Sequence, residues 1–485
     1  MLEIPRIFFR EEIRDDFCIS EMMKRSWAAQ LGILDAIKRL CDKYGLRYFA
    51  DYGTLLGAVR HHGYVPWDDD LDISMPRKDF MIFLEHADEI DEGLVVRSFY
   101  NSETYMNFNA VVTHKADTLA WDQERTDRYY GCPFICYVDI FPWDYVPRDK
   151  EAFEIQAGMF GLACKLMYDL RNIEYALFDR RTISLKELSA PEFMKYKAVS
   201  ELVGGCRELI GMLKEHNVLG AVNTETGKLR QQLCIAADTV AQMCAEEDAD
   251  GVEYFTVYSG SYRGAPRRRK EWQETTVELS FEFGTIRVPV EYLSAVKSKY
   301  GEGYMKPVRF TGDHGYPFFR NEIRVLIGGD TGELLTDTPL QDPSVEAIPE
   351  EIRTCLLKED GNLKRITLCG LSATDIINGG RPGLERIVAY LGQREAESDA
   401  VVFVFVPSGV LDFMDRCHLD MYPDYCHMLD QIGNMQNVIL DDSPTTDMLW
   451  ALISICDEYY GDECRLAEIC KKYDVPMTIR AIGEC

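Results

Sequence analysis

The chain lacks a hydrophobic run long enough to cross a lipid bilayer. Its longest uninterrupted apolar stretch runs from Ala400 to Val406, whereas a transmembrane helix needs about 20 apolar residues. The first residues, MLEIPRIFFREEIRDD, have no basic flank followed by the apolar core of a secretory signal. These two absences predict a cytoplasmic protein with no transmembrane segment.

Positive charge is also scarce. The 485 residues include 53 Lys and Arg against 81 Asp and Glu, which gives a formal net charge of −28. A chain this acidic is repelled by nucleic acid and by anionic membranes, so neither is expected as a partner. A nucleotide can still bind locally, through a metal ion and a few basic groups.

Paired zinc-ligand spacing is missing, although the chain contains 16 cysteines. The nearest pair is Cys132 and Cys136, which would share one face of a strand. Scattered cysteines of this kind are typical of buried, reduced thiols. The sequence therefore does not favour a zinc site.

The most informative stretch runs from Arg47 to Phe80, RYFADYGTLLGAVRHHGYVPWDDDLDISMPRKDF. It predicts a strand, a glycine-containing turn, a short helix and a second strand with acids at alternate positions. Asp70 and Asp72 should point the same way on that strand, while Leu71 and Ile73 point into a core. Two carboxylates held so close need a cation between them, and oxygen ligands favour Mg²⁺ or Mn²⁺.

The turn before these acids predicts an anion site. Gly53 and Thr54 follow the first strand and precede the short helix. Backbone N–H groups at a helix N-terminus favour phosphate, and glycine lets a phosphate approach the main chain. Arg60 and His61 would add positive charge or hydrogen bonds further along. A metal site beside a phosphate site indicates chemistry at phosphorus.

Three other interpretations of the letters DDDLD were weighed. A solvated acidic turn is the usual fate of a charge run, but Trp67 and Leu71 flank it as half-buried residues would. A calcium-binding EF-hand loop needs glycine at its sixth position and glutamate at its twelfth, where this chain has Ile73 and Asp79. A glycosyltransferase with an Asp-x-Asp metal motif stays open on spacing alone.

The letters GTLLGAVRHHGYVPWDDDLDI closely resemble the signature of the LicD family, whose members include bacterial phosphocholine transferases and, more distantly, the fukutin-related proteins. The resemblance implies a nucleotidyltransferase-like fold and a third carboxylate on a later strand, which would be Asp139 in YVDIFPWDYVP. We therefore expect Asp70, Asp72 and Asp139 to hold the metal and to act in catalysis. Asp68 is expected to contact these acids without binding the metal itself, and Asp144 is expected to lie in a turn beyond the strand.

The same resemblance implies a reaction. The donor would be a CDP-linked alcohol such as CDP-choline, and the acceptor a hydroxyl of a cell-surface glycan or its precursor, as in lipopolysaccharide or teichoic acid biosynthesis. Gly53 and Thr54 would orient the donor diphosphate, with Arg60 and His61 as further phosphate-binding groups. Two alternatives remain: a glycosyltransferase that uses a sugar nucleotide, and a non-catalytic nucleotide- or glycan-binding protein.

The chain is too long for one ordinary domain. Residues 1–327 are expected to form the catalytic domain, a mixed nucleotidyltransferase-like sheet with a helical insertion at about 150–248. Residues 328–360, rich in Thr, Asp, Pro and Glu, read as a linker. In residues 361–485 strands alternate with helices, which predicts a smaller, doubly wound parallel α/β domain.

Two further stretches have open roles. YSGSYRGAPRRRKEW is basic and could meet donor phosphates or an anionic acceptor, or could simply be solvated; the residues concerned are Arg263, Arg267, Arg268, Arg269 and Lys270. His314, in TGDHGYP, could approach the site or be structural. The tail YYGDECRLAEICKKYDVPMTI distantly resembles the nucleotide-binding half of GT-B glycosyltransferases, at Gly461, Asp462 and Glu468. Any parallel sheet places such turns at its strand ends, so the role of this domain stays undecided.

Overall fold

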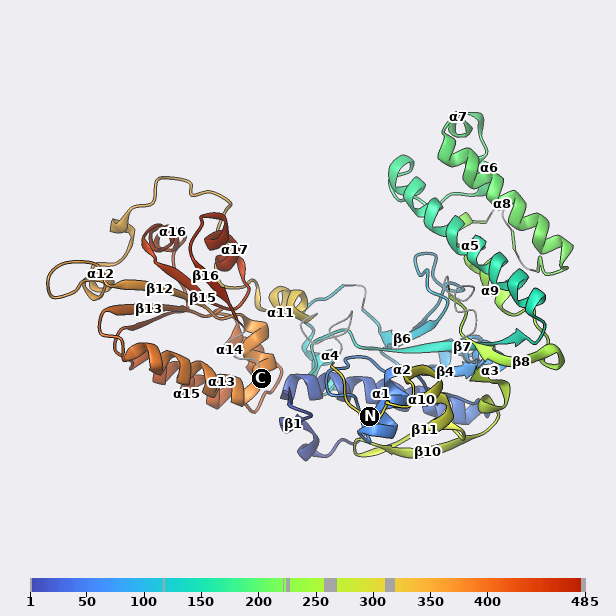
Figure 1. Cartoon of the computed structure of the whole chain (residues 1–485), viewed down its shortest axis with the longest axis horizontal. Helices are drawn as coiled ribbons and strands as arrows, with labels where there is room; N and C mark the ends of the chain where they lie inside the picture. Colours follow the sequence, from blue (N-terminus) through green and yellow to red (C-terminus); the bar gives the residue numbers. More distant parts are fainter. Residues whose placement is uncertain are drawn as a thin grey trace.

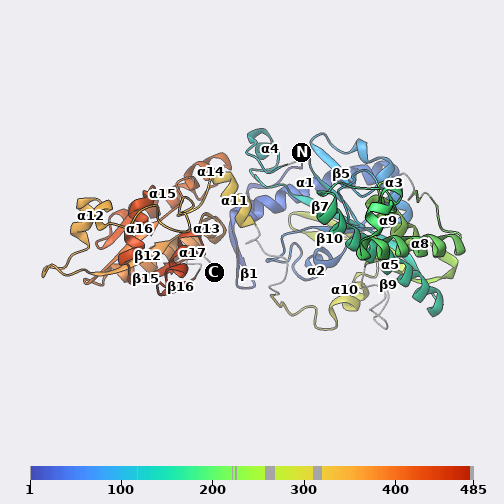
Figure 2. The same cartoon turned by 90° about the horizontal axis from the view of Figure 1, so that it is seen from above.

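The computed structural model describes residues 2–116, 118–220, 222–223, 227–256, 268–309 and 319–480. It contains a mixed sheet in the N-terminal part of the chain and a separate, wholly parallel sheet in the C-terminal part. Figure 1 shows these two parts on either side of helix α11 (Arg320–Ile327), and Figure 2 shows the same arrangement from above. The predicted fold class is confirmed.

Helix α1 (Glu21–Tyr44) packs against the mixed sheet. The side chain of Ser20 accepts a hydrogen bond from the N–H of Met23 at its start, and Gly45, with φ of 65°, ends it. Its apolar stripe is fully buried and packs against β6 and β7. The chain before it forms a 3₁₀ helix and the hairpin of β1 and β2, whose bounds are Arg6–Phe9, Glu12–Arg14 and Phe17–Ile19.

The mixed sheet has the order β3-β4-β7-β6-β5, and β8 and β9 extend it from the far part of β7. Strands β4 and β7 run parallel, with Asp72 directly opposite Asp139, and the other pairs are antiparallel. The bounds are β3 Phe49–Ala50, β4 Asp72–Pro76, β5 Leu94–Arg97, β6 Ala110–His114, β7 Tyr137–Pro147, β8 Ala249–Glu253 and β9 Arg268–Arg269. Short helices α2 (Tyr52–Arg60), α3 (Arg77–Glu85) and α4 (Gln123–Arg128) connect or flank these strands.

Asp144 does not lie in a turn, as the sequence suggested, but inside β7. The strand continues past Pro142 because its partner changes from β4 to β8, where Asp144 is opposite Glu253. Its carboxylate accepts bonds of 2.7 and 2.6 Å from the guanidinium of Arg77. Burial raises the pKa of Asp144 to about 6, and Arg77 opposes this rise. A buried pair, rather than solvent, keeps this acid in the sheet.

The helical insertion has its own apolar core. In Figure 1 it projects from the sheet, on the side away from the C-terminal part, and Figure 2 shows it again at the far end. Its long helices pack on one another, and its elements are α5 Lys150–Leu177, α6 Leu185–Leu188, α7 Pro191–Met194, α8 Lys197–Glu215 and α9 Leu229–Ala241.

A hairpin and a helix follow β9 and complete the N-terminal part. Strands β10 (Thr276–Phe281) and β11 (Gly284–Pro289) pair with each other, and α10 (Tyr292–Tyr300) follows and ends at Gly301, with φ of 74°. Helix α10 packs against α2, and β11 lies beside β3. This return of the chain brings Tyr300 and the residues after it to the cavity described below.

The C-terminal sheet has the order β14-β13-β12-β15-β16. Numbered along the chain this order is 3-2-1-4-5, the pattern of a doubly wound sheet. The strands are β12 Arg365–Gly370, β13 Ala400–Phe405, β14 Val438–Asp441, β15 Glu458–Gly461 and β16 Met477–Ile479. The helices are α12 Glu350–Cys355, α13 Ala373–Glu395, α14 Val410–Arg416, α15 Tyr422–Gly433, α16 Thr446–Ile455 and α17 Arg465–Lys472. Helix α11 packs on α13 and α14 and therefore belongs with this part.

No helix in the part of the chain that the structure describes is both long enough and apolar enough to span a bilayer.

Candidate active site

A cavity of about 830 Å³ opens where α2, the starts of β4 and β7, the end of β8 and the end of α10 meet. Four carboxylates line it, together with two cations and six aromatic rings: Asp68, Asp70, Asp72, Asp139, Arg60, Lys306, Tyr52, Trp67, Phe141, Tyr254, Tyr300 and Tyr304. Acids at this density inside a concave site are the arrangement expected around a bound cation.

The register of β4 and β7 places two of the acids. Asp72 is the first residue of β4 and lies opposite Asp139 of β7. The backbone N–H of Asp139 donates to the carbonyl of Leu71 at 3.0 Å, which fixes the two strands at this point. The side-chain amide of Asn109 donates to Asp139 and in turn accepts a 3.1 Å bond from the hydroxyl of Tyr105. Asp139 is thus held in a defined orientation.

The loop before β4 supplies the other two acids. The alternation pattern predicted that Asp70 lies on the strand. In the structure β4 begins only at Asp72, so Asp70 precedes it. Ligand oxygens of Asp68, Asp69 and Asp70 all lie within 4.8 Å of one another. Asp68, which we expected behind the site, lines the cavity itself. The loop turns back on itself, and spacing along a strand does not reveal such a turn.

The crowding of these acids raises the pKa values of Asp72 and Asp68. Burial raises the pKa of Asp72 well above its usual range, and the charges of Asp70 and Asp139 raise it further. Burial also raises the pKa of Asp68, and Asp70 adds to the rise. Without a cation, the folded protein must protonate part of this set or bear the repulsion. Oxygen ligands under this strain fit a hard divalent ion such as Mg²⁺.

The start of α2 forms one wall of the site. Tyr52 begins the helix with φ of 45°, a left-handed conformation that non-glycine residues rarely adopt and that strained functional sites often contain. Gly53 lines the cavity. Thr54 is buried, and its hydroxyl accepts a 2.8 Å bond from the N–H of Asp72. Thr54 therefore positions the acid strand and does not line the cavity.

Replacing Gly53 with alanine is expected to disable the site. A Cβ atom at this position would lie 2.0 Å from an oxygen of Asp68, so the acid loop or α2 would have to move. We expect Mg²⁺-dependent stabilisation in thermal melts to fall by half or more. Gly158→Ala is the matched control, since a Cβ there meets nothing within 4 Å and should stabilise α5 by about 1 kcal/mol. An unchanged Mg²⁺ response in Gly53→Ala would contradict this account.

Arg60 and His61 differ in their surroundings. The guanidinium of Arg60 lines the cavity, donates to the carbonyl of Tyr304 at 3.0 Å, and has no carboxylate within ion-pair distance among the described residues. It is a cation suited to an incoming anion. His61, which the sequence placed at the donor phosphate, does not line the cavity; its ring bonds Asp15 at 2.8 Å and Arg60 at 3.4 Å.

A buried ion pair lies beneath the site. The two terminal nitrogens of the Arg268 guanidinium donate to the carboxylate of Asp51, at 2.7 and 2.8 Å. The same carboxylate also accepts hydrogen bonds from the hydroxyl of Ser74 and the indole N–H of Trp143. Nζ of Lys299 lies 3.6 Å from the ring centroid of Tyr52. Burial, together with Arg268, lowers the pKa of Lys299 to about 8.

The basic stretch is therefore only partly solvated. Arg268 is committed to Asp51, and Lys270 donates to the carbonyl of Glu246 at 2.8 Å. Arg263, Arg267 and His314 lie outside the described residues. The pairing of Asp51 with Arg268 could not be predicted from local patterns, because 217 positions separate the two residues.

The C-terminal residues compared with GT-B enzymes lie at the end of β15 and on α17. Asp462 is buried, and its carboxylate accepts a 2.7 Å bond from the N–H of Ser372 at the start of α13. Glu468 pairs with Arg465 on the same helix. Asp462 therefore joins two strand ends across the sheet, and Glu468 serves the surface of α17.

A family model and several known proteins each match part of this chain. A family model described as LicD/FKTN/FKRP, nucleotidyltransferase domain, matches residues 45–160, which include all four cavity carboxylates. The lipopolysaccharide cholinephosphotransferase LicD of Haemophilus influenzae is 33% identical over 122 residues, 25% of this chain and 44% of that protein. Uncharacterized proteins of Rickettsia typhi and Rickettsia prowazekii are 50% and 52% identical over 44 and 40 residues, 9% and 8% of this chain and 14% and 15% of theirs. The chain thus spans less than half the length of the curated relatives it matches.

Proposed function

We propose, from the match of residues 45–160 to the LicD/FKTN/FKRP nucleotidyltransferase family model, that this chain is a metal-dependent phosphotransferase. It moves a phospho-alcohol group, phosphocholine or a close analogue, from a CDP-linked donor to a hydroxyl of a cell-surface glycan or its precursor. The observation that carries the proposal is the convergence in one cavity of four carboxylates and Arg60, which forms no ion pair with any carboxylate of the described residues.

The residues present fit a divalent metal ion. Asp68, Asp70, Asp72 and Asp139 offer only oxygen ligands, and their raised pKa values reflect a site with an excess of negative charge. When bound, Mg²⁺ would offset charge on the donor diphosphate and lower the pKa of the acceptor hydroxyl. The same acids would be unfavourable in a cavity that binds only a neutral sugar.

The chain's own groups have distinct tasks in this reaction. Arg60 binds a donor phosphate oxygen, and Gly53 keeps the wall of α2 free of a side chain there. Asp139, held by Asn109, accepts the proton of the acceptor hydroxyl. The hydroxyl oxygen forms a bond to the phosphorus that carries the alcohol, the bond from that phosphorus to the bridging oxygen breaks, and CMP leaves with the electron pair.

The aromatic lining favours a donor with a quaternary ammonium group. The rings of Tyr52 and Phe141 pack edge to face with their centroids 5.0 Å apart, and the centroids of Phe141 and Tyr254 are 4.9 Å apart. Tyr300 and Trp67 also line the cavity. Several ring faces around one space bind alkylated ammonium cations through cation–π attraction. This lining supports a choline-like alcohol within the proposed class of donors.

Product analysis tests the proposal. The full chain, Mg²⁺ and a glycan precursor acceptor are incubated with CDP-choline, and in parallel with UDP- and GDP-sugars. We expect CMP release from CDP-choline alone, and its loss in Asp139→Asn. Release of UDP or GDP would replace this proposal with a glycosyltransferase, and binding of nucleotide without any release would indicate a non-catalytic protein.

A further inference from the structure

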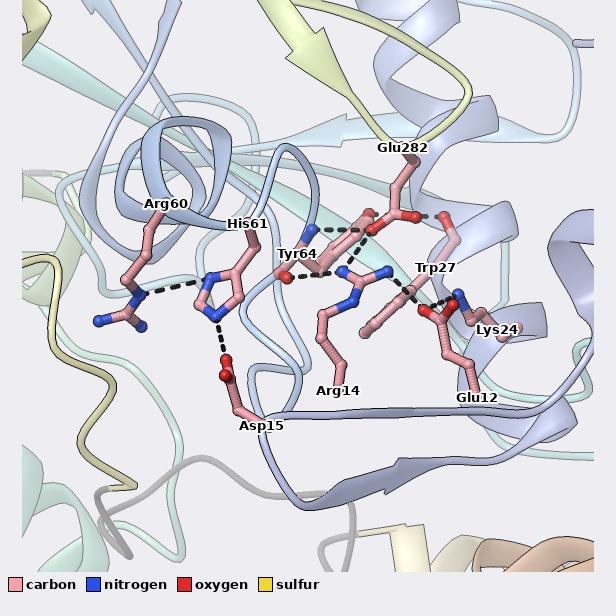
Figure 3. A network of polar contacts seen from close by, with 9 residues as sticks. All are labelled: Glu12, Arg14, Asp15, Lys24, Trp27, Arg60, His61, Tyr64 and Glu282. Carbon is pink, nitrogen blue, oxygen red and sulfur yellow. Dashed lines mark hydrogen bonds and ion pairs between the residues drawn. The ribbon is translucent and has the colours of Figure 1, made fainter.

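We propose that the N-terminal hairpin β1–β2 is a positioning strap for Arg60. It holds Arg60 toward the cavity through Asp15 and His61 (Figure 3), and it is itself fastened to the C-terminal domain. Asp15 and His61 are positioning residues, since they touch Arg60 or its neighbour and not the reacting groups. The inference rests on the proposed function in one respect only, the assignment of Arg60 to the donor phosphate.

The first link joins the hairpin turn to the cavity arginine. Asp15 occupies the turn between β1 and β2, with φ of 52°, and its carboxylate lies 2.8 Å from Nε2 of His61. Nδ1 of the same ring accepts the Nε–H of Arg60 at 3.4 Å. Since Nδ1 is an acceptor, the ring proton must sit on Nε2 and point to Asp15. Asp15 thus selects the tautomer of His61 that can hold Arg60.

The second link fastens the hairpin to the catalytic domain. Arg14 donates to the carbonyl of Tyr64 at 3.2 Å and to Glu282 at 3.1 Å, and lies 5.8 Å from the ring centroid of Trp27. Lys24 of α1 reaches Glu12 at 2.7 Å. Figure 3 shows these side chains as one connected network beside the His61 chain. Moving the hairpin would break several of these hydrogen bonds and ion pairs at once, so the network holds the hairpin in place.

The third link fastens the hairpin to the C-terminal domain. Helix α13 is broken at Gly380, with φ of 57°, and its second half starts with the N–H of Arg381 unpaired within the helix. Both carboxylate oxygens of Glu11 accept this N–H, at 3.0 and 2.9 Å. Sγ of Cys18 donates to the carbonyl of Gly379 at 3.8 Å. Five residues, Glu11 to Asp15, therefore connect α13 to the His61 ring that holds Arg60.

The strap makes the hold on Arg60 sensitive to acid. The groups that face His61 are Asp15 and Arg14 of the hairpin, Arg60 of α2, and the edge of Trp67. Burial lowers the pKa of His61, while Asp15 opposes the shift, so the ring is neutral at pH 7. Protonation of Nδ1 at lower pH would replace its acceptor with a second donor and release Arg60.

Variants of the turn test the first link. Asp15→Gly removes the carboxylate and suits the left-handed backbone, and Asp16→Gly is its match, since Asp16 is exposed in the same turn with φ of 59°. CDP-choline binding with Mg²⁺ is measured by calorimetry at pH 7.5. We expect Asp15→Gly to weaken binding about tenfold, the usual effect of losing one bond to a charged group, and Asp16→Gly to leave it unchanged. Equal affinities in the two variants would overturn the inference.

Variants of the ring test the pH dependence. His61→Asn keeps an acceptor where Nδ1 lies but cannot be protonated, and His61→Leu keeps no acceptor. From pH 7.5 to 5.5 we expect the wild type to lose affinity for CDP-choline, His61→Asn to lose much less, and His61→Leu to be weak throughout. An equal acid loss in wild type and His61→Asn would contradict the strap.

A measurement without donor separates this inference from the proposed function. Ring nitrogen shifts of ¹⁵N-histidine-labelled protein, assigned with His61→Asn, report the tautomer directly. We expect the Nε2–H form in the wild type and in Asp16→Gly, and a mixture in Asp15→Gly. The Nδ1–H form in the wild type would overturn the strap, whereas failure to bind CDP-choline with the expected tautomer present would overturn only the proposed function.

Discussion

Asp72→Asn is expected to raise the melting temperature of the metal-free protein while it abolishes both the response to Mg²⁺ and transferase activity. Asp72 is buried among other carboxylates, and burial, then Asp70 and Asp139, raise its pKa in the folded state. Asparagine keeps the shape but removes the charge, which relieves repulsion and deletes a ligand. Since a metal ion supplies several kcal/mol to such a reaction, we expect activity to fall by about 10³-fold or more.

The sign of this effect depends on pH. A carboxyl whose pKa is raised on folding contributes stability when protonated and loses it as pH rises from its unfolded value of 3.8 through the raised folded value. The metal-free wild type should therefore lose stability across that window relative to Asp72→Asn, by about 1.4 kcal/mol per pH unit for one group. Thermal melts from pH 4 to 8, with and without Mg²⁺, measure both effects.

The control for this variant is Asp88→Asn, which neutralises an exposed acid away from the cavity. It should change neither the melting temperature beyond a degree or two nor the response to Mg²⁺. If Asp72→Asn destabilised the metal-free protein and kept its Mg²⁺ shift, the carboxylate would be a structural group and the metal assignment would be wrong.

Arg77→Met is expected to destabilise the protein by about 3–5 kcal/mol, the cost of leaving buried acids without their cation. The side chain of Arg77, 11% exposed, lies between Asp144 of β7 and Asp238 of α9, and one of its nitrogens is 2.9 Å from the carboxylate of Asp238. The hydroxyl of Tyr100 also bonds Asp238. Removing the arginine leaves two acids facing each other at the junction of the sheet and the helical insertion.

Urea unfolding measures this loss, with Arg39→Met as the control because Arg39 pairs with Asp35 and Asp91 at the surface, where such pairs contribute little. The loss in Arg77→Met should shrink on acidification, since Asp144 already has a pKa of about 6 and takes up a proton more readily without its partner. Similar losses in the two variants, or a loss that grows at low pH, would show that the buried cluster does not stabilise this junction.

The local sequence determined the pieces of this protein. The spacing of apolar residues before Gly45 predicts α1, and the alternation of strand and helix signals predicts the C-terminal parallel sheet. The motif from Gly53 to Asp72 lies inside the segment that the LicD/FKTN/FKRP model matches, and it contains three of the four cavity carboxylates. These features depend on neighbours within a few residues, through periodicity, capping and turn chemistry. These features can therefore be predicted from the sequence without knowing which distant segments pack together.

Tertiary structure alone decided how the pieces work together. The parallel register of β4 and β7 places Asp72 opposite Asp139, and the loop before β4 places Asp68 in the cavity wall. The ring of His61 bonds Asp15 of the first hairpin and does not line the cavity. Each outcome depends on groups from distant parts of the chain, whose contacts are set by burial and by the pairing of buried charges. Local patterns supply the residues, and the energy of long-range packing selects their partners.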